Sequence, residues 1–184
     1  MNSQPPSQGG KKTLLVVDWD NVFMGLCNDC GLERIRLQER IGKMAAWIQD
    51  DVSPLISVGG FIFAPEHLNR FHKKVFTQHS CFKFIICPKT DSGKDTVDEE
   101  IISFCLWAIQ HPEVGYLCLA SADNGFYDLF QKAQALGVKR ALVIPSLNSL
   151  KKKPKGGRLV DCIDNHPLTG KKMAFRLDLC LNSG

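Results

Sequence analysis

The stretch TLLVVDWDNV at residues 13–22 decides the fold, because an unbroken apolar run ends there in two closely spaced acids. The apolar part is typical of a strand that is buried on both faces. Four similar runs follow at residues 55–64, 82–88, 115–121 and 138–144. Together they predict five strands of one sheet.

Helical patterns separate these runs. Ile41, Met44, Ala45 and Ile48 recur at i, i+3, i+4 and i+7, which places them on one helix face. Further helical stretches are predicted after Pro65, over 97–108 and over 126–136, the last closed by a glycine. Strands alternating with helices are typical of βαβ units and a parallel sheet.

The predicted fold class is α/β, a single-domain three-layer α/β/α sandwich with a mainly parallel, Rossmann-like sheet of five or six strands. Apolar residues alternate with others over 173–181, which predicts an additional edge strand. Residues 1–12 are polar and predict a disordered leader before a domain over 13–184. Residues 145–158 predict a basic loop.

Length and composition narrow the class of protein. The 184 residues suit one domain, and 44% hydrophobic with 23% charged residues is an ordinary globular balance. No apolar run approaches the roughly 18 residues of a spanning helix, so no membrane association is expected. The N-terminus does not resemble a secretory signal. The net charge of +4 is compatible with an anionic partner.

The cysteines predict an intracellular chain. Cys87, Cys105 and Cys118 lie in apolar runs and are expected to be buried, reduced thiols. Cys27 and Cys30 form a single CxxC, and Cys162 with His166 makes a poor second ligand pair for zinc. A cytoplasmic location is expected, with the nucleus as an alternative.

Polar residues gather where the strands end. In open α/β sheets, sites form outside the carboxyl ends of the strands. Carboxylates that converge there repel one another, and Mg²⁺ or Mn²⁺ with oxygen ligands relieves that repulsion. The candidates follow three of the strands: Asp18, Asp20 and Asn21; Lys94 and Asp98; Ser121, Asp123 and Asn124.

Each acid also has a structural interpretation. Asp98 has the spacing of a capping box with Asp95, and Asp123 suits a helix N-cap. Asp18 has no evident capping role at the end of a buried strand. Asp128 belongs to the solvated face of its predicted helix.

VVDWDNV, GKDTVDEEI and LASADNGFYDL, in that order at these strand ends, resemble the NYN domain of the PIN-like nuclease superfamily, which includes LabA-like proteins. The resemblance covers about residues 13–145 and implies metal-dependent hydrolysis of RNA phosphodiesters. It makes Asp18, Asp98 and Asp123 the catalytic and metal-binding residues. One departure is Gly125, where the family often carries a second Asp; Asp20 is an alternative fourth acid.

The physical logic agrees with this interpretation. A cation held by the three acids would orient water and bind a phosphate oxygen. Asn21 and Ser121 would hold water or phosphate by neutral hydrogen bonds, and Lys94 would meet phosphate as a point charge.

Two other interpretations stay open. DWDNV at residues 18–22 also fits the first motif of haloacid-dehalogenase-like phosphatases, with Asp18 as nucleophile. That fold expects Ser or Thr after the second strand, where this chain has Ala64 and Pro65. The other alternative is a non-catalytic RNA-binding or scaffold module on the same fold.

RNA is the expected partner. A basic segment is a candidate phosphate track or nuclear-import signal, and equally a solvated loop: Lys151, Lys152, Lys153, Lys155 and Arg158. Trp19 and Phe23 are candidates for base stacking, or for the core. The sequence leaves a homo-oligomer or a protein partner open.

Overall fold

A computed structural model describes residues 11–30, 37–48, 52, 59–68, 82–145 and 157–179. Six strands form one sheet, in which every strand pairs in parallel with its neighbours. The strand order is β3-β2-β1-β4-β5-β6. The bounds are β1 Lys12–Asp18, β2 Gly59–Pro65, β3 Phe82–Cys87, β4 Val114–Ala120, β5 Lys139–Ile144 and β6 Ala174–Arg176.

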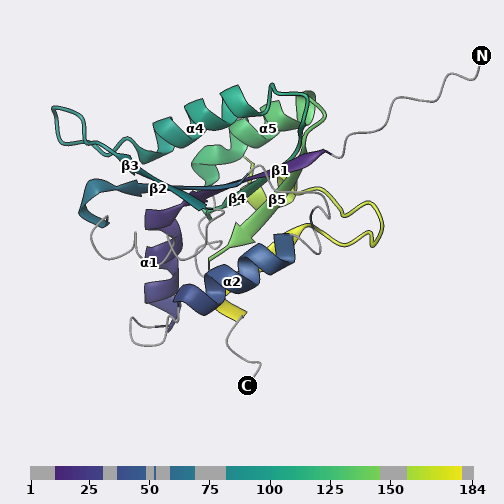
Figure 1. Cartoon of the computed structure of the whole chain (residues 1–184), viewed down its shortest axis with the longest axis horizontal. Helices are drawn as coiled ribbons and strands as arrows, with labels where there is room; N and C mark the ends of the chain where they lie inside the picture. Colours follow the sequence, from purple (N-terminus) through teal and green to yellow (C-terminus); the bar gives the residue numbers. More distant parts are fainter. Residues whose placement is uncertain are drawn as a thin grey trace, which may run out of the picture.

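Helices cover both faces of the sheet. Helices α1 Trp19–Cys30 and α2 Leu37–Trp47 lie on one face, and α4 Val97–Ala108 and α5 Tyr127–Ala135 lie on the other (Figure 1). Short 3₁₀ helices lie between these elements: η3 Glu66–Leu68, η4 Asn124–Phe126, η6 Leu159–Cys162 and η7 Leu177–Leu179. The chain is therefore a three-layer α/β/α sandwich with a six-stranded parallel sheet, which confirms the predicted fold class.

The sequence explains the central elements directly. Residues 13–18 of β1 are all buried, as expected for a strand with helices above and below. Helix α4 buries Val97, Ile101, Cys105 and Ala108, which recur on one helix face. Helix α5 is followed by Gly137 at a φ of 72°, a left-handed backbone that glycine adopts without steric cost.

The strand order places a switch point beside β1. The connection from β1 leads outward to β2 and β3, whereas β4, β5 and β6 extend the sheet in the opposite direction. In doubly wound sheets the loops after the two strands at this reversal diverge to opposite faces, and a crevice opens between them. The carboxyl ends of β1 and β4 form that position here.

Two elements differ from the sequence-based expectation. Helix α1 is absent from the predicted elements; it begins at Trp19, immediately after β1, so no loop residues separate strand from helix. Of the strand expected over 173–181, the described residues up to 179 form a strand over Ala174–Arg176. It ends because the chain turns into η7, where the carbonyl of Leu177 accepts a hydrogen bond from the buried guanidinium of Arg40 on α2.

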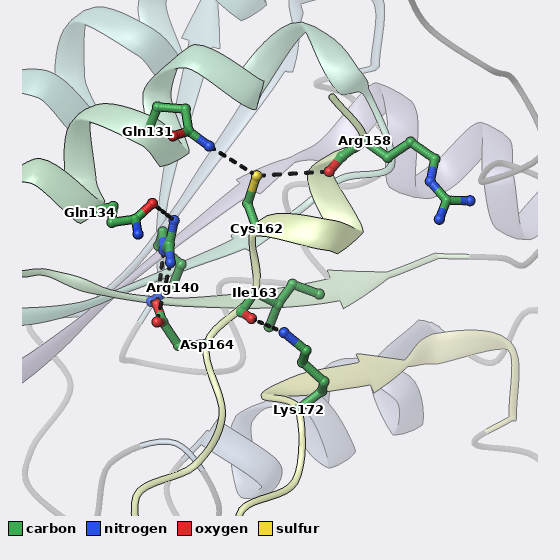
Figure 2. Close-up of polar contacts among 8 residues, drawn as sticks. All are labelled: Gln131, Gln134, Arg140, Arg158, Cys162, Ile163, Asp164 and Lys172. Atoms are coloured by element: carbon green, nitrogen blue, oxygen red, sulfur yellow. Dashed lines mark hydrogen bonds and ion pairs between the residues drawn. The ribbon is translucent and has the colours of Figure 1, made fainter. Parts of the chain in front are cut away.

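The segment 157–179 is attached to the edge of the sheet by a partly buried ion pair. Asp164 accepts from the side-chain Nε of Arg140 at 2.8 Å and from the Arg140 backbone N–H at 2.8 Å, as Figure 2 shows for the side chains. A second contact runs from Lys172 Nζ to the carbonyl of Ile163 at 2.5 Å. The first contact joins the segment to β5 and the second lies within the segment, while Gln131 of α5 donates to Cys162 of η6.

Some expectations lie outside the described residues. They are residues 1–10 of the leader expected over 1–12, the helical stretch beyond residue 68, and residues 146–156 of the loop expected over 145–158. Lys12 already belongs to β1, so the expected leader extends too far. No helix in the described part of the chain is both long and apolar enough to cross a membrane.

Candidate functional site

Asp18 is the last residue of β1, and only 4% of its surface is exposed. Its Oδ2 accepts a hydrogen bond from the Ser121 hydroxyl at 2.9 Å, and its Oδ1 accepts one from the Asn21 backbone N–H at 3.3 Å. Burial nevertheless raises the pKa of the Asp18 carboxyl from 3.8 to about 7. Near neutral pH the Asp18 carboxyl is therefore present in both its charged and its neutral form.

A hydrogen bond joins the first turn of α1 to the loop that follows β4, and a second one lies within that loop. Asn21 Oδ1 accepts from the Ala122 N–H at 2.9 Å, and Ser121 Oγ accepts from the Asp123 N–H at 3.1 Å. Asn21 of α1 and Ser121 thus hold the loop after β4 beside Asp18. These bonds satisfy two backbone N–H groups that follow the end of β4 and have no partner in the sheet.

Asp98 is the second residue of α4, and the helix N-cap is Thr96 rather than Asp95. The capping-box interpretation of Asp98 is therefore wrong, because the helix begins one residue later than that spacing requires. Asp95 instead accepts the Val97 N–H at 2.9 Å. Partial burial, and then the nearby Asp123 carboxylate, raise the pKa of Asp98.

Asp123 has the structural role expected from its sequence position. It is the N-cap of η4, and its Oδ1 accepts the Gly125 N–H at 2.8 Å. Its side chain also borders the same cavity as Asp98 and Asp18. The capping role uses one carboxylate oxygen, so capping and ligand binding are compatible in this residue.

The three predicted acids meet at one open cavity of about 210 Å³ at the sheet's switch point. Five of its lining residues are aspartates, and no lysine or arginine of the described residues contributes to it. Asp20 enters from the first turn of α1, which brings the alternative fourth acid to the site. The lining residues are Asp18, Asp20, Asn21, Asp95, Val97, Asp98 and Asp123.

Asp95 is the lining acid that sequence reasoning does not select. It precedes the N-cap of α4 and follows a tight turn in which Gly93 has a φ of 79°. Its signal in the sequence is its position three residues before Asp98, a spacing that also fits a capping box. After this turn, Asp95 lies at the border of the cavity.

The donor set has the chemistry of a hard-cation site. Among the described residues, no three Asp, Glu, His or Cys side chains are close enough to hold one ion directly as they stand. Mg²⁺ usually keeps several waters and binds through one or two carboxylates, so an open oxygen-rich cavity fits it and Mn²⁺. Burial is the main cause of the raised pKa of Asp18 and of Asp98, and neighbouring carboxylates raise both pKa values further.

The structure places the remaining candidates away from the cavity lining. Lys94 is exposed and pairs with Glu99, and Asn124 accepts the Leu159 N–H at 2.9 Å. Asp128 is exposed in the first turn of α5, as its sequence position predicts. Trp19 is a core residue with 1% exposure, so it does not present a face for base stacking.

The basic segment is described only at its end. Arg158 pairs with Asp161 at 3.0 Å on the surface, whereas Lys151, Lys152, Lys153 and Lys155 lie outside the described residues. Among the cysteines, burial of Cys87, Cys105 and Cys118 is confirmed. Cys27 is half-buried, and the side chain of Cys30 is not among those that the structure describes.

Burial raises the pKa of Cys87 to about 11 and moves the pKa of Cys105 and Cys118 upward as well. All three are therefore thiols rather than thiolates at neutral pH. Cys162 is engaged by Gln131, and His166 Nδ1 accepts backbone N–H groups of its own turn.

Comparison with known proteins supports the fold alone. No protein-family profile matches the chain, and no curated protein matches it. A crystal structure of a protein of unknown function from Vibrio parahaemolyticus is similar over 96% of this chain and 98% of its own, with a TM-score of 0.63 and 17% sequence identity. At that identity the similarity concerns the architecture of the sheet and its helices.

Proposed function

We propose that this protein is a metal-dependent ribonuclease that hydrolyses RNA phosphodiester bonds. One observation carries the proposal: Asp18, Asp98 and Asp123, from three separate parts of the chain, border one cavity at the switch point of the sheet. Ligand sites of doubly wound sheets form at that position. The resemblance of the three motifs to the NYN domain supports the same activity.

The acids would hold Mg²⁺ or Mn²⁺, which supplies Lewis-acid polarisation and a more acidic water when bound. Asp18 must release its proton to act as a ligand, and the Ser121 hydrogen bond favours that charged form. Asn21 connects the first turn of α1 to the loop after β4 through the Ala122 N–H. Asp20 and Asp95 add negative charge at the rim, which favours a second cation or further hydration.

The cavity favours a polymer backbone over a free nucleotide. Its volume of 210 Å³ lies below the roughly 300–1,000 Å³ of pockets that enclose a drug-sized ligand. No cationic side chain of the described residues lines it, so a phosphate group enters only together with cations. A phosphodiester group fits these conditions while its bases remain outside.

Competing activities fit the lining less well. A dinucleotide site needs a glycine-rich first turn, whereas this turn carries Asp18, Trp19 and Asp20. A haloacid-dehalogenase-like phosphatase leaves Asp98 without a role, although this residue borders the cavity. A non-catalytic RNA-binding module is the second candidate, favoured by Gly125 at a position where an acid is common in the resembled family.

The decisive experiment is cleavage of single-stranded RNA, structured RNA, DNA and a small phosphate ester with Mn²⁺, Mg²⁺ or EDTA. We expect cleavage of RNA with either cation and none with EDTA. Asp18→Asn, Asp98→Asn and Asp123→Asn should each lose activity, whereas Asp128→Asn, which alters an exposed acid of α5, should keep it. Activity in all three variants would reject the proposal, and RNA binding without cleavage would favour the non-catalytic module.

The same proposal places the protein where RNA and reduced thiols occur together, in the cytoplasm or the nucleus. The buried free thiols Cys87, Cys105 and Cys118 suit such a compartment.

A further inference from the structure

Asp123 is held by hydrogen bonds rather than by packing. Its side chain is exposed, so neighbouring apolar groups do not fix its orientation. Its N–H bonds to Ser121 Oγ at 3.1 Å, and its carboxylate caps Gly125 at 2.8 Å. The position of this acid therefore depends on the backbone of the short loop between β4 and α5.

Asn124 fastens this loop to a segment far along the chain. Its Oδ1 accepts the N–H of Leu159 at 2.9 Å, across 35 residues. Leu159 is the first residue of η6, whose N-cap residue Arg158 makes no side-chain capping bond. Asn124 thus satisfies a helix N–H that the local sequence leaves without a cap.

The partner segment is itself firmly placed. The backbone at Gly157 packs against the ring of Tyr127, because a Cβ there would lie 1.9 Å from a ring carbon. Cys162, at the other end of η6, accepts from Gln131 at 3.3 Å, and Figure 2 shows this contact beside the Arg140–Asp164 pair. Leu159 is 1% exposed. Its N–H therefore offers Asn124 a fixed anchor.

We infer that Asn124 is a positioning residue, which sets the orientation of Asp123 by binding the start of η6. The inference rests on the proposed function for its catalytic consequence. If Asn124 has this role, the segment 157–179 helps to position the acidic site, although none of its described residues lines the cavity.

The test compares Asn124→Ala with Gln131→Ala, which removes a second polar contact between this region and η6. Amide hydrogen exchange is measured in EDTA, so that it depends on neither cation nor RNA. Loss of the Asn124 bond should speed exchange at the Asp123 and Gly125 amides by about threefold to tenfold. Gln131→Ala should leave both rates unchanged, and Asn124→Asp, which keeps an acceptor oxygen, should preserve them.

Calorimetry with Mn²⁺ provides the second readout. Asn124→Ala should weaken Mn²⁺ binding by about threefold to tenfold, while Gln131→Ala binds as the unaltered protein does. Unchanged exchange at residues 123 and 125, or faster exchange without weaker binding, overturns the inference. If the unaltered protein neither binds Mn²⁺ nor cleaves RNA, the proposed function fails, and the exchange rates still decide whether Asn124 positions the loop.

A second pair of variants tests the same hydrogen bond from the Leu159 side, in case Asn124→Ala folds poorly. Leu159→Pro and Leu159→Ala both lose the leucine side chain, but only proline also removes the N–H. Proline suits the first residue of a helix, and Arg158 before it has φ −88° and ψ 137°, a conformation that proline permits. Faster exchange at Gly125 in Leu159→Pro than in Leu159→Ala supports the inference, and equal rates contradict it.

Discussion

The Ser121 hydroxyl donates a hydrogen bond of 2.9 Å to Asp18 Oδ2 and joins the ends of β1 and β4 at the switch point of the sheet. Both residues are buried. The same hydroxyl oxygen accepts the N–H of Asp123 at 3.1 Å. One serine therefore links two of the three acids of the proposed cation site.

Replacing Ser121 by Ala should weaken cation binding in a pH-dependent way. The hydroxyl lowers the pKa of Asp18, so its removal moves that pKa further upward. We expect Mn²⁺ binding at pH 7 to weaken by about threefold to tenfold, with a smaller difference at pH 9, where Asp18 is ionised in both proteins. Calorimetry at the two pH values measures this, with Ser103→Ala on the exposed surface of α4 as control. An equal effect at both pH values would contradict the role assigned to the hydroxyl.

Asp18→Asn should stabilise the cation-free protein at high pH. The pKa of Asp18 is raised by folding from 3.8 to about 7, so the stability that its neutral form contributes is fully present below pH 4 and is lost as the pH rises through about 7. The uncharged amide avoids this loss. We expect a gain of roughly 1–3 kcal/mol at pH 8, less than the full linkage value because the amide has one acceptor oxygen and Nδ2 cannot accept either from the Asn21 N–H or from the Ser121 hydroxyl, whichever it faces.

Urea unfolding in EDTA at pH 4.5 and pH 8 measures that gain. Asp128→Asn, on the solvated face of α5, should show no such pH dependence. An Asp18→Asn protein that is less stable than the unaltered one at pH 8 would show that the carboxylate is compensated in the folded state.

The sheet could be predicted because each central strand carries a continuous apolar run. Leu14 to Val17 and Leu117 to Ala120 are buried on both faces, and such runs have few alternatives in a chain with intervening helical patterns. Helix α1 could not be predicted in the same way. It follows Asp18 without a loop, so Trp19 and Asp20 resemble the residues of a strand-end turn.

The site was predictable only in part. Topology brings Asp18 and Asp123 together. Asp18 ends β1 and Asp123 follows β4, and these two strands lie side by side at the switch point. Asp95 depends on a turn with a positive φ at Gly93, and Asn124 depends on a contact with Leu159 across 35 residues. Neither relationship leaves a periodic signal in the sequence. The contact of Arg40 with the Leu177 carbonyl just after β6 likewise joins residues far apart in the sequence.

The lysines of the basic segment should control RNA affinity. Changing Lys151, Lys152 and Lys153 to Ser should weaken binding to all RNA sequences alike and reduce the slope of log affinity against log salt by about 0.7 for each phosphate that no longer meets a lysine. The matched control changes the exposed Lys83, Lys132 and Lys139 to Ser, which removes the same net charge elsewhere. Equal effects in the two variants, measured by fluorescence anisotropy, would mean that global charge rather than this segment governs binding.

Gly125→Asp should raise Mg²⁺-dependent cleavage, because it restores an acid where the resembled family often has one. The backbone permits the change: Gly125 is not among the described glycines with positive φ, which are Gly93, Gly137 and Gly170. A Cβ at residue 125 would lie 3.3 Å from Asp123 Oδ1, so the loop must shift by a few tenths of an ångström. An added carboxylate near Asp123 increases the attraction for Mg²⁺, which needs charged oxygen ligands.

Gly125→Ala separates the two effects of this substitution, since it introduces the same Cβ without the carboxylate. We expect Gly125→Ala to keep or slightly lower activity, and Gly125→Asp to raise the Mg²⁺-dependent rate relative to Gly125→Ala and to narrow any preference for Mn²⁺. Thermal unfolding of both variants checks that the cap between Asp123 and the residue 125 N–H survives. If Gly125→Asp is well folded and no faster than Gly125→Ala, residue 125 is not the missing ligand, and Asp20, which already borders the cavity, becomes the acid to replace next.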